Sequence, residues 1–126
     1  PLVSNFELFL RLMEDPRYEG LVFGDLSGLT LFNRLGTPLR TILRRSDLHP
    51  RLVNASDYPV PAVNVLIRTG DLEDEGYITA AERKALNEIY KYNPLLFDLV
   101  LRRLVKDPES GQKLPDSVFI PNPNLP

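Results

Sequence analysis

The segment from Asp71 to Glu82 has the spacing of a calcium-binding EF-hand loop. The oxygen ligands of such a loop fall at fixed offsets, and a glycine in the middle makes a sharp turn. Gly76 stands at the turn position, and Ile78 at the apolar position after the backbone ligand. The predicted ligands are the side chains of Asp71, Glu73, Glu75, Thr79 and Glu82 with the carbonyl of Tyr77.

The same segment has two other interpretations. Positions three and five of an EF-hand loop usually hold Asp or Asn, and the glutamates here are one methylene longer. A turn followed by a capping box, in which Thr79 and Glu82 start the next helix, uses the same residues. As a further alternative, paired acids of the carboxylate cluster would do general acid–base work, which requires a cleft that excludes water. The cluster consists of Asp71, Glu73, Asp74 and Glu75.

A cluster of basic residues offers a different chemistry. Arg40 and Arg44 are four residues apart, so they share one face of a predicted helix. Such a face can hold phosphates through salt-sensitive contacts, and it predicts RNA binding. Alternatively, it is the solvated face of an amphipathic helix. The predicted RNA contacts are Arg40, Arg44, Arg45 and Arg51, with Arg34 and His49 nearby.

The composition favours a protein that acts through its surface. The 126 residues include no Cys and one His, and the net charge is -2. We therefore expect no enzyme activity and no cofactor, because catalysis at neutral pH usually needs a tuned nucleophile, base or bound ion. No apolar run reaches the roughly 20 residues that span a bilayer, so we expect no membrane contact and an intracellular or intraparticle location.

The elements that position these residues are mainly helices. Ser4 and Glu7 form a predicted capping box before an amphipathic helix that ends at Asp15-Pro16. Apolar positions from Leu29 to Leu35 predict a second helical stretch, and Thr37-Pro38 restarts that pattern. Further helices are predicted from Thr79 to about Tyr92 and after Asn93-Pro94.

Short apolar runs between the helices predict strands. These runs are Gly20–Gly24, Pro50–Asn54, Val60–Arg68 and Ser117–Ile120, and a helix beginning at Pro61 is the alternative for the third. The alternation predicts a small layered α/β fold with a short, largely parallel sheet flanked by helices. An all-helical fold is the competing interpretation. We expect one domain over residues 1–120 and an extended Pro/Asn-rich linker, the start of a flexible tail, over 121–126.

Part of the chain resembles a known viral family. The order of several segments is similar to that of the minor inner-core protein of cystoviruses, the double-stranded RNA bacteriophages. The element Leu31–Arg34, Leu-x-Asn-Arg, is its most recognisable part. The segments that carry the resemblance are Glu7–Leu12, Gly20–Phe23, Gly28–Leu35 and Thr41–Leu43, with a shorter similarity at Glu75–Thr79.

The resemblance implies a non-enzymatic cofactor of procapsid assembly and RNA packaging. It implies a homodimeric α/β domain in the inner core of the virion, present in the host cytoplasm during assembly. The implied partners are the viral polymerase, the packaging NTPase, the major inner capsid protein and single-stranded viral RNA. The family supplies no catalytic residues, and calcium-dependent regulation through residues 71–82 is the alternative function.

Overall fold

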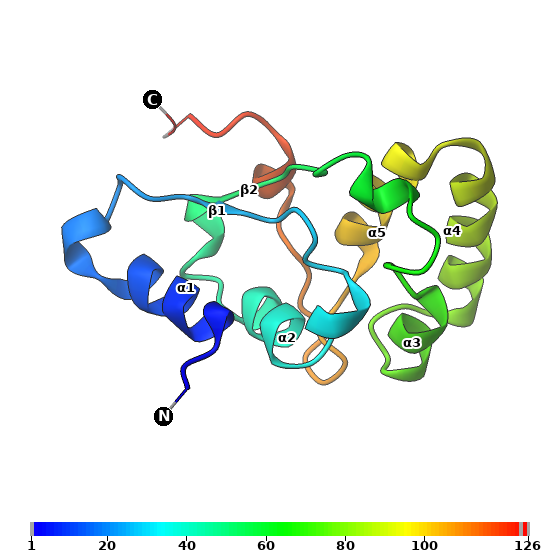
Figure 1. The fold of residues 1–126 in the computed structure, drawn as a ribbon, viewed down its shortest axis with the longest axis horizontal. Helices are drawn as coiled ribbons and strands as arrows, with labels where there is room; N and C mark the ends of the chain where they lie inside the picture. The colour runs from blue at the N-terminus through cyan, green and yellow to red at the C-terminus, as the bar shows by residue number, and fades with distance from the viewer. Residues whose placement is uncertain (1, 124, 126) are drawn as a thin grey trace.

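A computed structural model of the chain describes residues 2–123 and 125. Most of the regular structure is helical, and two short parallel strands pair within the first half of the chain (Figure 1). The predicted small α/β fold with a parallel sheet is therefore confirmed. The linker predicted over 121–126 lies partly outside the described residues, because positions 124 and 126 are not among them.

The sheet is one parallel pair connected through a helix. Strand β1 (Gly24–Asp25) pairs with β2 (Leu52–Val53), with Gly24 opposite Leu52. The connection contains α2 (Thr37–Arg44), which begins after Gly36. Parallel strands need such a crossover because a tight turn cannot join them. The predicted strand at Pro50–Asn54 is thus confirmed in shortened form.

Helix α1 (Asn5–Glu14) lies at one side of this unit, and the 3-10 helix η1 (Pro16–Tyr18) follows it. The Oγ of Ser4 accepts a hydrogen bond from the backbone N–H of Glu7 (3.1 Å), as predicted. The cap satisfies a donor that the first helical turn leaves unpaired. Glu7 itself pairs with Arg11 (2.5 Å), so the return half of the capping box is absent.

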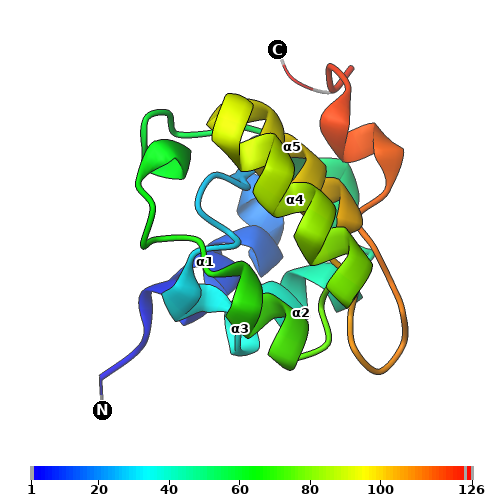
Figure 2. The ribbon, with the colours of Figure 1, turned by 90° about the vertical axis from the view of Figure 1, so that its right-hand side faces the viewer.

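The second half of the chain is a helical layer. Helix α3 (Thr69–Asp74) leads into α4 (Ala80–Tyr92), which packs against α5 (Pro94–Leu104), as Figures 1 and 2 show. The capping box of Thr79 and Glu82 is confirmed in both directions. Asn93 caps α5 through its side chain, which accepts the N–H of Leu96 (3.0 Å).

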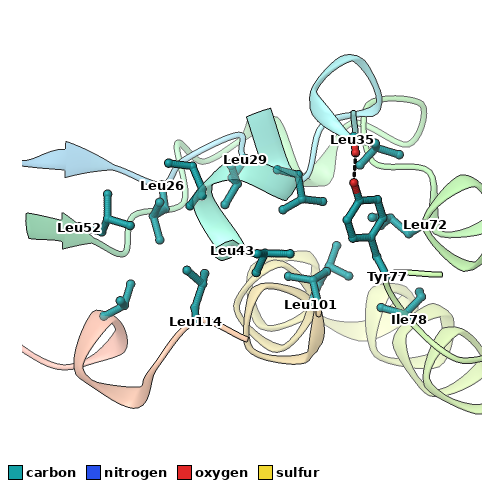
Figure 3. Packing of buried hydrophobic residues seen from close by; sticks show 14 of the residues in the cluster. Leu26, Leu29, Leu35, Leu43, Leu52, Leu72, Tyr77, Ile78, Leu101 and Leu114 are labelled. Atoms are coloured by element: carbon teal, nitrogen blue, oxygen red, sulfur yellow. Dashed lines mark hydrogen bonds between the residues drawn. The ribbon is translucent and has the colours of Figure 1, made fainter. Parts of the chain in front are cut away.

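One apolar core joins the two halves. Side chains from β2, α2, α5, the loop after β1 and the segment after α3 meet in it (Figure 3). The buried residues of α2 are Leu39, Ile42 and Leu43, as the periodicity predicts. Tyr77 is fully buried, and its hydroxyl donates to the carbonyl of Leu35 across the core (Figure 3).

Three predicted elements differ from the structure. Val60–Arg68 is not a strand but the 3-10 helix η4 (Val60–Ala62) followed by turns, since Pro61 has no N–H to pair in a ladder. Ser117–Ile120 belongs mostly to the 3-10 helix η5 (Asp116–Phe119). In Gly20–Gly24 only Gly24 is in a strand, because Gly20 turns the chain with a positive φ of 75°.

The stretch predicted as helical from Leu29 to Leu35 is also corrected. It contains only the 3-10 helix η2 (Phe32–Arg34), and Gly36 caps α2 so that Thr37 is already helical. At the other end of the chain, the Asn122 amide donates to the carbonyl of Pro50 (2.9 Å). The end of the described chain is therefore held against the segment that enters β2, which begins after the 3-10 helix η3 (His49–Arg51).

Candidate interaction surface

A half-open groove of about 400 Å³ runs between α1, α2 and the loop that follows β1. Its floor is apolar, and its rim carries amide, hydroxyl and charged groups. A concave apolar site with a few polar groups on its edge is the usual form of a binding site. The groove is lined by Asn5, Phe6, Phe9, Asp25, Leu26, Ser27, Leu29, Asn33, Arg34, Pro38 and Ile42.

Local contacts hold this groove in shape. The rings of Phe6 and Phe9 stack with centroids 6.0 Å apart on the inner face of α1. Phe9 approaches Gly24 so closely that a Cβ there would lie 2.9 Å from its ring. On the rim, Asp25 accepts the N–H of Ser27 (2.6 Å), and Arg34 donates to the carbonyl of Gly28 (3.1 Å).

The predicted RNA contact Arg44 lies on the opposite side of α2 from this floor and forms ion pairs. Its Nε is 2.9 Å from Asp107, and its Nη2 is 3.0 Å from Glu109. Asp107 is almost fully buried and also accepts from the Oγ of Ser110 (2.7 Å). The hydrogen bonds from Arg44 and Ser110 hold the pKa of the Asp107 carboxyl well below its usual range.

Arg45 is paired in the same way. It binds Glu14 at the end of α1 (2.7 Å) and Asp47 in the next turn (2.9 Å). Its hydrogen bond lowers the pKa of Asp47. Arg44 and Arg45, two of the four predicted RNA contacts, therefore each pair with two carboxylates. These carboxylates offset the positive charge of the basic cluster that the sequence shows.

The remaining two predicted contacts have different surroundings. Arg51 binds backbone carbonyls, with its Nη1 2.5 Å from Met13 and its Nε 3.1 Å from Val22. It thereby fixes the chain between α1 and β1. Arg40 is half-buried, and its Nε has no hydrogen-bond partner within residues 2–123 and 125. Burial raises the pKa of Tyr77, and the charge of Arg40 opposes that shift.

The structure does not bring the predicted calcium ligands together. Asp71 and Glu73 lie in helix α3, where they cannot wind around one ion, and Glu82 accepts the N–H of Thr79 (2.9 Å). The carbonyl of Tyr77 accepts from the N–H of Lys106 (3.1 Å). Glu75 and Thr79 remain exposed. Over the described residues, no group of three His, Cys, Asp or Glu side chains is placed to hold a metal ion.

The turn itself is as predicted, since Gly76 has a φ of 86°. The two glutamates of the catalytic alternative are not in a shared cleft: Glu73 lies 3.7 Å from Arg83, and Glu75 is exposed. The capping interpretation of this segment is therefore the one that the structure confirms. The calcium-loop geometry is wrong because residues 71–74 continue a helix instead of opening into a loop.

Sequence reasoning missed a buried ion pair in α5. Arg102 is 1% exposed and binds the carboxylate of Asp98 one turn earlier. It also donates to the carbonyls of Ala55 and Leu26, which follow β2 and β1. The four-residue spacing was visible in the sequence, but such pairs are usually exposed. Arg102 here connects α5 to both strands.

Comparison with protein-family models, curated proteins and solved structures finds no match to this chain. Within the part of the chain that the structure describes, no helix has the length and apolar character needed to cross a bilayer.

Proposed function

We propose that this protein is a non-enzymatic cofactor of viral procapsid assembly and RNA packaging that works through protein contacts beside the viral polymerase. It acts in the inner core of a cystovirus-like virion, assembled in the host cytoplasm. Two things support the proposal: the resemblance over Glu7 to Leu43, and the groove that this stretch forms.

The position of the groove is the observation that carries the proposal. Apart from Asn5 and Phe6, every residue that lines it falls between Glu7 and Leu43. Five of the lining residues lie in the segments that carry the resemblance, and they contribute to a concave, largely apolar surface: Phe9, Leu29, Asn33, Arg34 and Ile42. A surface of this kind suits a protein partner because burying apolar area drives association.

The rim indicates which partner surface would fit. Asp25 is exposed at the edge of the groove and forms no ion pair within the described residues. Arg34 is bound to backbone carbonyls. A partner segment with an apolar anchor and an adjacent Lys or Arg would fill the floor and pair with Asp25. Among the implied partners, we expect the polymerase, the packaging NTPase or the major inner capsid protein to present it.

The proposal is tested by adding the recombinant protein to purified core proteins. We expect faster procapsid assembly and higher packaging of single-stranded RNA. Ser27→Arg places a large charged side chain at the groove, and it should remove most of the acceleration. Ser117→Arg makes the same change on the exposed surface of η5 and should leave it intact. No acceleration by the wild-type protein, or equal loss in both variants, would refute the proposal.

Two parts of the proposal have separate measurements. Light scattering coupled to size exclusion reports whether the protein is a homodimer. RNA contact at the basic cluster is tested with the double variant Arg44→Ala/Arg45→Ala, which should bind more weakly and with a reduced salt dependence. Equal binding by that variant would exclude the basic cluster as an RNA contact.

A further inference from the structure

At the edge of the helical layer, an arginine side chain stacks on the face of an exposed aromatic ring. The guanidinium carbon of Arg68 lies 4.1 Å from the ring centroid of Phe32, which is 40% exposed. The N–H of Phe32 donates to the carbonyl of Leu66 (2.9 Å), and Arg68 donates to Val65 (3.3 Å). The bond from Phe32 joins η2 to the segment before α3, and the local bond from Arg68 orients its guanidinium, so the fold itself positions the stacked pair.

Arg68 also lines a cavity of about 250 Å³. This volume is smaller than the roughly 300–1,000 Å³ of pockets that enclose drug-sized molecules, so it suits a single ring system. The aromatic rings of Tyr90 and Phe97 line the cavity edge to face, 5.1 Å apart, and the Tyr90 hydroxyl donates to Ala62 (3.0 Å). The lining residues are Val63, Asn64, Ile67, Arg68, Thr69, Gly70, Asn87, Tyr90 and Phe97.

The polar groups of this cavity have free hydrogen-bonding capacity. The hydroxyl of Thr69 donates to the Oδ1 of Asn87 (2.9 Å), and neither amide hydrogen of Asn87 has an acceptor among the residues that the structure describes. The Asn64 side chain is exposed and makes no hydrogen bond within residues 2–123 and 125. Side-chain amides present a donor and an acceptor side by side, which matches the edge of a nucleobase.

Charge distinguishes this site from the basic cluster on α2. Arg68 has no carboxylate partner in the described part of the chain, whereas Arg44 has two. Arg83 lies next to the cavity, with its Nη2 3.2 Å from the position of a Cβ on Gly70. Its Nε is buried without a partner among the described residues, and its contact with Glu73 is long at 3.7 Å.

We propose that the Phe32–Arg68 site and its cavity bind one base of a single-stranded nucleic acid, with Arg68 and Arg83 facing the adjoining phosphates. Aromatic and guanidinium planes stack on any base, and cations track the backbone. This inference rests on the site itself and does not require the assembly role. A protein segment is the competing occupant, but the small cavity and the Arg68 guanidinium, which has no carboxylate partner among the described residues, favour a nucleotide unit.

Fluorescence anisotropy with labelled 15-mers of oligo(U) and oligo(dT) tests the proposal on the isolated full chain. Arg68→Ala should weaken binding of the oligonucleotide about 5- to 150-fold, the range that corresponds to the loss of one stacked base. Arg68→Lys should also weaken it, since it keeps the charge but loses the planar stack. Two phosphate contacts predict a slope of log affinity against log salt of about −1.4.

Arg103→Ala is the matched control. Arg103 also lies over an aromatic ring, 5.0 Å from Phe119, and its removal changes the net charge equally. It is paired with Asp116 (2.9 Å) and does not line the cavity, so we expect less than a twofold effect. Circular dichroism should give the same spectrum for both variants and the wild-type protein, which checks that the fold is kept.

A second measurement follows the side-chain amide signals of Asn64 and Asn87 in nuclear magnetic resonance spectra during titration with oligo(U). Shifts confined to this site support the proposal. Several results would overturn it: no binding of either oligomer by the wild-type protein, equal losses in Arg68→Ala and Arg103→Ala, or a larger loss in Arg44→Ala/Arg45→Ala. Arg68→Ala that slows core assembly but binds oligomers normally would instead assign the site to a protein partner.

Discussion

Replacing Arg102 should destabilise the fold more than any other single arginine change. The side chain is 1% exposed and binds Asp98, and its guanidinium donates to the carbonyl of Ala55. Arg102→Met keeps most of the apolar stem but leaves a carboxylate and a carbonyl without their donor. Breaking a buried ion pair from one side costs about 3–5 kcal/mol. We therefore expect a loss of about 3–5 kcal/mol in the free energy of unfolding.

A double-mutant cycle separates the ion pair from the carbonyl contacts. Asp98→Leu alone should also be costly, because it leaves the guanidinium charge buried without its counterion. The double variant Arg102→Met/Asp98→Leu removes both charges and leaves the carbonyl of Ala55 unsatisfied, a penalty of about 1–3 kcal/mol. The carbonyl of Leu26 keeps the N–H of Leu29 as its donor. The double variant should thus be more stable than either single variant, and the effects should be far from additive.

The loss in Arg102→Met should depend on pH. Burial raises the pKa of Asp98 from 3.8 to about 6, and the charge of Arg102 opposes this shift. Without Arg102 the folded-state pKa rises further. A carboxyl with a raised folded pKa stabilises the fold most at low pH and loses that contribution as the pH rises. The difference in stability between Arg102→Met and wild type should therefore be larger at pH 8 than at pH 5.

Urea unfolding followed by circular dichroism at the two pH values measures these differences. Arg103→Met is the matched control, because the neighbouring arginine is exposed and should change stability by less than about 0.5 kcal/mol. A cost below 1 kcal/mol for Arg102→Met, strict additivity in the cycle, or a pH-independent difference would refute the reasoning.

Two other predictions concern the contacts that shape the candidate surfaces. Gly24→Ala would place a Cβ 2.9 Å from both Phe9 and Leu52, so overpacking should cost about 1–3 kcal/mol in urea unfolding; an unchanged midpoint would show that α1 is not held against β1. Asp107→Asn removes a carboxyl whose folded-state pKa is depressed by Arg44, so the variant should be less stable at pH 7. The difference should narrow as the pH falls below 3.8, and thermal unfolding at pH 7 and pH 2.5 measures it.

Local signals in the sequence were enough to predict most helices. Thr79 and Glu82 satisfy each other's backbone donors, and Asn93 caps the following helix, so three residues fix two boundaries. The apolar face of α2 follows from its 3.6-residue period. The strands could not be predicted as reliably as the helices. Each strand is two residues long, and it forms only because it pairs with a segment far along the chain.

The wrong predictions of a strand at Val60–Arg68 and of a calcium loop at Asp71–Glu82 have a common cause: tertiary structure sets a backbone conformation that the local pattern does not specify. Val60–Arg68 is rich in β-branched residues, but Pro61 is buried in a 3-10 turn, and tertiary contacts outweigh the strand propensity. The EF-hand spacing at Asp71–Glu82 describes ligands only if the backbone is a loop. Here Thr69–Asp74 is helical, so the same carboxylates point away from a common centre and Glu82 serves the helix cap.

The roles of the arginines show why the candidate sites required the structure. Arg44 is neutralised by Asp107, 63 positions away, and Arg102 reaches Ala55 across 47 positions. No window of the sequence contains those pairs, so the density of Arg between positions 40 and 51 overstates the charge available to a ligand. Arg68 is the opposite case, because it is isolated in the sequence and yet keeps its charge available to a ligand. It stacks on the exposed ring of Phe32 and has no carboxylate partner among the described residues. Because an uncompensated cation attracts an anion more strongly than a paired one, a phosphate contact should be sought first at Arg68.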